Sequence, residues 1–160
     1  MANTYTQLHI HIVFAVKYRD ALINPCWETD LYKYITGIVQ SQGHKVIQIN
    51  GMPDHIHILI GLRPCQSLAH LMMSVKSRSA NWINSTKQGK RRFIWQSGYG
   101  AFSVSRGDLG RVANYIRKQK IHHQRISFDD ELISALKENE IEFNRKYLLV
   151  SPIDNQAKVD

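Results

Sequence analysis

The chain has 160 residues, 43% hydrophobic and 21% charged, which is ordinary for one globular domain with a buried core. No apolar run approaches the roughly 18 to 20 residues that span a bilayer, and the N-terminus lacks a signal-type apolar stretch, so we expect a cytoplasmic protein without a membrane partner. The formal net charge of +8, from 21 Lys and Arg against 13 Asp and Glu, favours nucleic acid as the partner over a merely basic surface.

The first half of the chain predicts a strand, a helix and a β-hairpin, in that order. Apolar and polar side chains alternate through residues 7–14, as they do in a half-buried strand. Apolar residues then recur at helical spacing between Pro25, which suits a first helical turn, and Gly43, which can close the helix in a left-handed conformation. Two short strands, "HKVIQIN" and "HIHILIGL", flank the turn "GMPD" and form the hairpin.

The second half predicts a helix, a strand and two further helices. Ser67 can cap the first of these helices. The aromatic segment "FIWQSGYGAFSVS" is expected to be a strand that its glycines kink or bulge. Asp108 then begins a helix that continues to about His123, and Ser127 caps a last helix with an acidic first turn.

The order β-α-β-β-α-β followed by extra helices predicts an α+β fold of the ferredoxin-like or RRM-like class. This fold has a four-stranded antiparallel sheet with two helices on one face, to which the additional C-terminal helices are joined. We expect residues 1–150 to form a single domain and residues 151–160 to be a flexible tail.

Two pairs of histidines at strand spacing are the first candidates for a metal site. His55 and His57 alternate with isoleucines, so their side chains share one face of a strand with Cα atoms roughly 7 Å apart. Two imidazoles at that distance can converge on one ion, although histidines on the open face of a sheet are often only solvated. His9 and His11 have the same spacing on a neighbouring strand, and spacing alone does not rank the two pairs.

The segment "YIRKQKIHH" offers further polar side chains on one helical face. Tyr115 and Gln119 are four residues apart, which places them side by side on a helix, and His122 extends the same stripe. Taken alone, a tyrosine and a glutamine in this pattern are more often a packing residue and a solvated one. Their combination with the histidine strand points to a site.

Three motifs in this order, "GMPDHIHILIGL", "WQSGYGAFSVS" and "YIRKQKIHH", resemble the single-tyrosine HUH transposases of bacterial insertion sequences, a superfamily that includes the REP-associated tyrosine transposases. The resemblance implies that His55, His57 and Gln119 bind a divalent metal and that Tyr115 is the nucleophile, forming a 5′-phosphotyrosine intermediate. It assigns no catalytic role to the histidine pair on the first strand. The implied metal is Mg²⁺ or Mn²⁺, with zinc as the alternative from ligand softness.

The resemblance also implies the partners. Family members recognise hairpins in single-stranded DNA at element ends, and they act as homodimers whose active sites are shared in trans. The polar joint "SVSRGD" before the tyrosine helix would permit such an exchange. The basic residues that we expect to contact DNA are Lys17, Arg19, Lys76, Arg78, Lys87, Lys90, Arg91 and Arg92. Aromatic residues could stack on bases, but Trp95 and Phe102 fit the core better.

Three functions compete on this evidence. The first is a metal-dependent tyrosine transposase that cleaves and rejoins single-stranded DNA. The second is a domesticated repeat-associated nuclease of the same chemistry. The third is a non-catalytic RRM-like nucleic-acid-binding module, which would leave the convergent histidines, tyrosine and glutamine as coincidence. No general base is evident, and His122 is the one candidate.

Overall fold

A computed structural model describes residues 3–87 and 91–148 of the chain. Its sheet has the strand order β2-β3-β1-β4, and the pairs β2–β3, β1–β3 and β1–β4 are all antiparallel. This is the order of the ferredoxin-like fold, so the predicted fold class is confirmed. The strands are β1 (His9–Ala15), β2 (Lys45–Met52), β3 (His55–Gly61) and β4 (Gly100–Ser103). The tail predicted at 151–160 lies outside the described residues.

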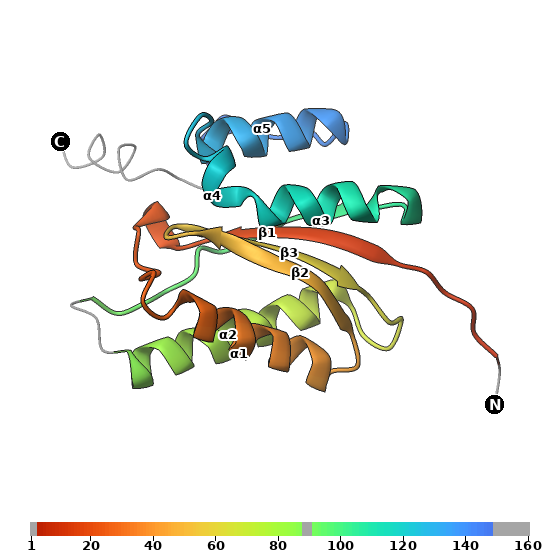
Figure 1. Cartoon of the computed structure of the whole chain (residues 1–160), viewed down its shortest axis with the longest axis horizontal. Coiled ribbons are helices and arrows are strands. Elements are labelled where there is room, and N and C mark those ends of the chain that lie inside the picture. The colour runs from red at the N-terminus through yellow and green to blue at the C-terminus, as the bar shows by residue number, and fades with distance from the viewer. Residues whose placement is uncertain (1–2, 88–90, 149–160) are drawn as a thin grey trace.

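Helices lie on both faces of the sheet (Figure 1). One face carries α1 (Glu28–Ser41) and α2 (Leu68–Thr86), and the other carries α3 (Leu109–Arg117), α4 (Gln119–His122) and α5 (Phe128–Glu138). The predicted caps are present, since the Ser67 and Ser127 hydroxyls accept hydrogen bonds from the backbone N–H groups of His70 and Asp130. Among the described helices, none combines the length and the apolar character that crossing a membrane requires.

The larger core lies between the sheet and helices α1 and α2. The isoleucines that alternate with the histidines of β3 are buried there, together with Phe14 of β1. Burying such a side chain contributes roughly 1.5 to 3 kcal/mol, so the alternation on these two strands fixes which face meets the helices. Trp95 is 7% exposed and its Nε1 donates to the Ser79 hydroxyl at 2.9 Å, which confirms its interpretation as a core residue.

The opposite face of the sheet is also buried. Val13 and Phe102 pack against Phe128 and Leu132 of α5, and a neighbouring cluster joins Leu59 of β3 to α3. Phe102 is 6% exposed and therefore belongs to the core, as its sequence context favoured. Because α3, α4 and α5 cover this face, the histidines of β3 are enclosed, and the alternative that they are solvated is wrong.

The third predicted helix is broken into two. The backbone leaves helical geometry at Lys118, where ψ is 17°, so α3 ends at Arg117 and α4 begins at Gln119. The Asn50 side-chain amide of β2 donates to the carbonyls of Ile116 and Arg117 at 3.1 and 3.0 Å. These carbonyls find a partner on the sheet in place of the next helical turn, and the chain turns toward the sheet beyond them.

Candidate metal and nucleophile site

His55 and His57 lie on the central strand β3, each 1% exposed, and neighbouring side chains hold both rings. Asp54 Oδ1 lies 2.7 Å from His55 Nδ1, and Arg19 lies 3.5 Å from the other oxygen of the same carboxylate. The Nδ1 atom of His57 lies 2.8 Å from Nε2 of His11, and the two rings stack. The Nε2 atoms of both β3 histidines are thereby turned away from these partners and toward helices α4 and α5.

The two histidines of β1 lie at different distances from the site. His11 contacts His57 and so belongs to the surroundings of the site, although the resemblance gave it no role. Burial and the nearby His57 lower the pKa of His11 to about 3, so it is neutral and can share a single proton with its neighbour. His9 lies opposite Gly61, at the other end of the β1–β3 ladder from His55.

Gln119 and Tyr115 reach the same place from the helices above. Gln119 is fully buried, and its Oε1 lies 3.3 Å from Nε2 of His55. The half-buried Tyr115 donates its hydroxyl hydrogen bond to Glu131, and His122 Nε2 lies 3.4 Å from that hydroxyl. The four residues predicted as metal ligands and nucleophile are thus gathered in one site, although their roles stay predictions.

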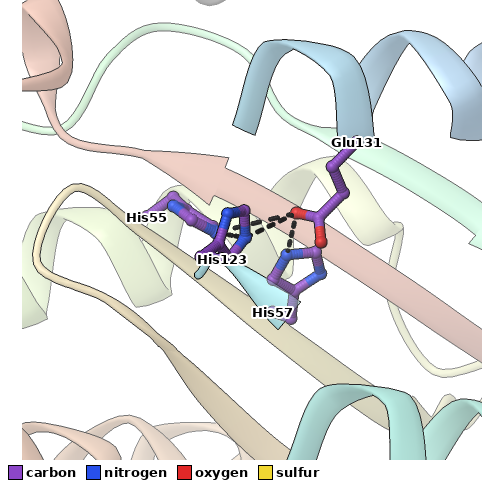
Figure 2. A group of neighbouring side chains, drawn as sticks. All are labelled: His55, His57, His123 and Glu131. Atoms are coloured by element: carbon purple, nitrogen blue, oxygen red, sulfur yellow. Dashed lines mark hydrogen bonds and ion pairs between the residues drawn. The ribbon is translucent and has the colours of Figure 1, made fainter. Parts of the chain in front are cut away.

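Two residues that the sequence did not single out, His123 and Glu131, complete the cluster. One potential ligand atom from each of His55, His57, His123 and Glu131 lies within 4.8 Å of the others. Figure 2 shows the three imidazoles and the carboxylate of Glu131 pointing toward one another, with Glu131 descending from α5. The doublet "HH" could have indicated His123, but Glu131 has a ready local explanation as one of three acids in the first turn of a helix.

The members of this cluster differ in their electrostatics: burial favours a neutral His57, whereas the contact with Glu131 outweighs burial and raises the pKa of His123. Burial lowers the pKa of His57, which is then in the form that binds metals. Burial alone would raise the pKa of Glu131, but its contacts with His123 and His57 outweigh that effect and lower it. Burial and the adjacent Glu131 raise the pKa of Tyr115, so its hydroxyl is a neutral phenol in the chain as described.

A cleft of about 520 Å³ leads to these groups. Its lining includes His57, Tyr115 and Glu131 of the site and the exposed Arg111 of α3. Its volume is within the usual range of binding pockets, roughly 300 to 1,000 Å³. The tyrosine hydroxyl and the cluster can therefore be reached by part of a substrate.

The predicted DNA-binding residues fall into two groups, and Lys90 lies outside the described residues. In the first group, Lys87, Arg91 and Arg92 line a hollow of about 1250 Å³ beside the C-terminal end of α2. Lys87 lies over the ring of Trp82, and Arg91 forms an exposed ion pair with Asp20 at 3.2 Å. The remaining exposed members are Lys17 and Arg78.

Arg19 and Lys76 form the second group, because their charged ends bind within the chain. Arg19 forms ion pairs with Asp54 and Asp129, and its guanidinium lies 4.6 Å from the centre of the Phe128 ring. Lys76 donates to the carbonyls of Gln96, at 2.7 Å, and Gly98. Their contacts hold α5 and the segment before β4 in place, and a role in DNA binding stays a prediction for both.

In this structure the residues of the site all come from one chain. Helix α3 packs on its own strands, with Val112 and Ile116 against Leu59, and its end is held by Asn50. The resemblance implied instead that Tyr115 and Gln119 of one chain meet the histidines of another. The exposed residues 105–108 join β4 to α3. If two chains exchanged α3 and the helices after it at this joint, each site would keep the same contacts.

Comparisons with known proteins show the family to which the chain belongs. The family described as "Transposase IS200 like" matches residues 4–119. The ISDra2 transposase TnpA of Deinococcus radiodurans is 27% identical over 118 residues, which are 71% of this chain and 84% of that protein.

Two solved structures share the fold. A Deinococcus radiodurans R1 protein described as a transposase has a TM-score of 0.60 and 22% identity, over 74% of this chain and 95% of that one. The REP-associated tyrosine transposase bound to a REP hairpin has a TM-score of 0.58 and 12% identity, over 79% of this chain and 74% of that one. Since the family match spans most of the chain, from β1 to Gln119, this protein belongs to the IS200-like transposase family.

Proposed function

We propose that this transposase cleaves and rejoins single-stranded DNA through a covalent bond between Tyr115 and a 5′-phosphate. The observation that carries the proposal is the position of the Tyr115 hydroxyl beside a buried cluster of imidazole, amide and carboxylate groups. His55, His57 and Gln119 would hold a divalent ion, as the family resemblance implies. A non-catalytic RRM-like module gives no reason for these groups to be enclosed together.

The chemistry follows from the residues present. A divalent ion bound at the cluster would neutralise charge on the scissile phosphate and help to orient it for in-line attack. The Tyr115 oxygen forms a bond to phosphorus while the bond from phosphorus to the 3′-oxygen breaks, which leaves a free DNA 3′-hydroxyl. A 3′-hydroxyl later attacks the phosphotyrosine and releases Tyr115, so rejoining needs no nucleotide cofactor. Glu131 and His122 are the side chains that contact the hydroxyl whose proton must leave.

The donor types fit a divalent metal. Imidazole nitrogens suit Mn²⁺ better than Mg²⁺, which prefers oxygen ligands, and both ions are proposed for this site. Zinc stays the alternative, because imidazole-rich sites also suit it. Comparing cleavage with each ion, after chelation and dialysis, would establish the preference.

The proposed substrate is a hairpin formed in single-stranded DNA at the ends of a mobile element. The net charge of +8 and the hollow lined by Lys87, Arg91 and Arg92 support binding to a folded nucleic acid. A structural neighbour, the REP-associated tyrosine transposase, is bound to a REP hairpin. That neighbour also favours the second candidate function, cleavage of scattered chromosomal repeats by a domesticated relative.

A direct experiment tests the proposal. The purified protein is incubated with single-stranded DNA from both flanks of its own gene, with Mg²⁺ or Mn²⁺, and separated on a denaturing gel. We expect a metal-dependent band in which protein and the 5′ end of a cleaved strand stay joined. If no adduct forms with any flanking palindrome, the proposal that this protein cleaves single-stranded DNA through a covalent adduct is wrong. Cleaved palindromes that are confined to the ends of an element support transposition. Cleaved palindromes that are scattered as chromosomal repeats support the domesticated nuclease.

The salt dependence of hairpin affinity is expected to report phosphate contacts made in the hollow lined by Lys87, Arg91 and Arg92. Replacing Arg91 and Arg92 together by Ala should reduce the slope of log affinity against log salt by roughly 1 to 2. A variant that makes fewer phosphate contacts releases fewer counterions when it binds. Fluorescence anisotropy with a labelled hairpin measures this slope. Lys45→Ala with Lys137→Ala removes the same charge from other exposed positions and should change the slope less. Equal changes in the two variants would place the contacts elsewhere.

Complementation is expected to reveal whether two chains share their sites. We propose a homodimer in which α3 and the helices after it are exchanged, so a Tyr115→Phe chain mixed with a His55→Ala chain should regain cleavage. Random pairing would restore about one quarter of the sites. A mixture that stays inactive, although subunit exchange is shown independently, would establish the single-chain site instead.

A further inference from the structure

Hydrogen-bond partners fix the proton positions on two of the clustered histidines. His55 Nδ1 lies 2.7 Å from the Asp54 carboxylate, and His123 Nδ1 lies 2.9 Å from the carbonyl oxygen of Ile126. Both partners can only accept a hydrogen bond, so both Nδ1 atoms donate. In neutral rings the Nε2 atoms then carry lone pairs, and these two Nε2 atoms lie 3.1 Å apart.

Two oxygen acceptors join the same space. Gln119 Oε1 lies 3.0 Å from Nε2 of His123 and 3.3 Å from Nε2 of His55, while Gln119 Nε2 donates to Glu131 Oε2 at 3.0 Å. Glu131 Oε1 lies 2.8 Å from Nε2 of His57 and 3.2 Å from Nε2 of His123. Several lone pairs thus converge in a buried volume, which is unfavourable unless a proton or a cation compensates them.

The spacing of these atoms matches the coordination sphere of a metal ion. Ligands about 2.1 Å from one ion lie roughly 3.0 to 3.5 Å from their neighbours in octahedral or tetrahedral geometry. The separations between the clustered atoms are close to that range. The bonds from Nδ1 to a carboxylate and to a backbone carbonyl are also the partners that usually orient metal-binding histidines.

His123 and Glu131 come from a part of the chain that the family match does not reach. That match ends at Gln119, whereas Glu131 lies on α5. The helix is held firmly, since Phe128 and Leu132 are buried against the sheet and Asp129 pairs with Arg19. The carboxylate is therefore placed in the cluster by packing and not by a mobile loop.

We propose that Glu131 and His123 are two further ligands of the ion, so that α5 completes a metal site begun by His55, His57 and Gln119. This inference rests on the proposed function, in which that ion serves strand cleavage. Glu131 binds the ion through Oε1 and holds the Tyr115 hydroxyl through Oε2. A single carboxylate thereby sets the distance between the nucleophile and the ion. Three imidazoles and two oxygens favour Mn²⁺ or Zn²⁺ over Mg²⁺.

Calorimetric titration with Mn²⁺ tests the proposal without requiring cleavage. Glu131→Gln keeps the size of the side chain and should weaken Mn²⁺ binding by more than about tenfold. Asp130→Asn removes the same charge from an exposed position of the same helix that does not line the cleft, and it should leave the affinity unchanged. Thermal unfolding of both variants checks that the fold is retained.

The outcomes separate this inference from the function on which it rests. If His57→Ala abolishes Mn²⁺ binding but Glu131→Gln does not weaken it, Glu131 is not a ligand of the ion. Its contacts in the cluster are then an ion pair with a protonated His123, and the proposed function stands. If the unaltered protein binds no divalent ion, both proposals are wrong. Should Glu131→Gln fail to fold, anomalous diffraction from wild-type crystals soaked in Mn²⁺ decides, because the ion must lie within bonding distance of Glu131 Oε1 and His123 Nε2.

Discussion

Tyr115→Phe is expected to abolish the covalent protein–DNA adduct and to lower strand cleavage by at least roughly a thousandfold. The substitution removes the attacking oxygen and leaves the ring, whose edge packs near His57 and His11. Affinity for the uncleaved hairpin should stay within about twofold, since the lost hydroxyl contacts Glu131 and lies outside the hollow lined by Lys87, Arg91 and Arg92. A denaturing gel with labelled DNA measures the adduct, and anisotropy measures the binding.

Tyr32 provides the matched control. It is also a partly buried tyrosine whose hydroxyl meets a carboxylate, that of Glu28 at 3.4 Å, but it lies on α1, across the sheet from the cluster. Tyr32→Phe should form the adduct at the wild-type rate. An adduct that persists in Tyr115→Phe would show that Tyr115 is not the nucleophile. Loss of the adduct in Tyr32→Phe as well would show that its loss is not specific to Tyr115.

His57→Ala is expected to abolish metal-dependent cleavage and to weaken Mn²⁺ binding by at least about a hundredfold. The imidazole is a proposed ligand and is fully enclosed, so its removal also leaves Glu131 without its shortest contact to an imidazole in the cluster. Calorimetry measures the affinity, and circular dichroism checks that a variant with a new cavity still folds.

His9→Ala is the control for this experiment. His9 lies on the same face of the sheet in an H-x-H motif of its own, but it is paired with Gly61 at the far end of β3. Its removal should change neither metal affinity nor cleavage. Equal losses in the two variants would mean that the site extends along the whole β1–β3 ladder.

The fold could be predicted from the sequence because its elements carry local signals. The alternation in β1 and β3, the serine caps and the left-handed Gly43, with φ of 90°, each correspond to an element end or face in the structure. The break at Lys118 could not, because it depends on Asn50 of a strand more than sixty residues away. Local helical spacing continues through that point without a glycine or proline.

The grouping of the candidate site residues could be predicted in part for the same reason. His55 and His57 form a strand motif, and Tyr115 and Gln119 follow a helical one, so both pairs are visible in the sequence. Glu131 reaches them only through the packing of α5 on the sheet, a tertiary effect. One signal for that packing was present, since Val13 and Leu59 are apolar on the face that was expected to be open, and strands covered on both sides lose their alternation.

The position of Glu131 also has a consequence for the order in which the chain matures. His57 and Glu131 are 74 residues apart, and closing a loop of that length costs roughly 4 kcal/mol in chain entropy. Such a non-local contact is expected to form after the local helices and the hairpin, and it is lost when α5 detaches from the sheet. A newly synthesised or partly opened chain would therefore hold folded strands and the tyrosine helix without a complete cluster. On the proposed ligand set, metal-dependent cleavage would therefore require α5 to be docked on the sheet.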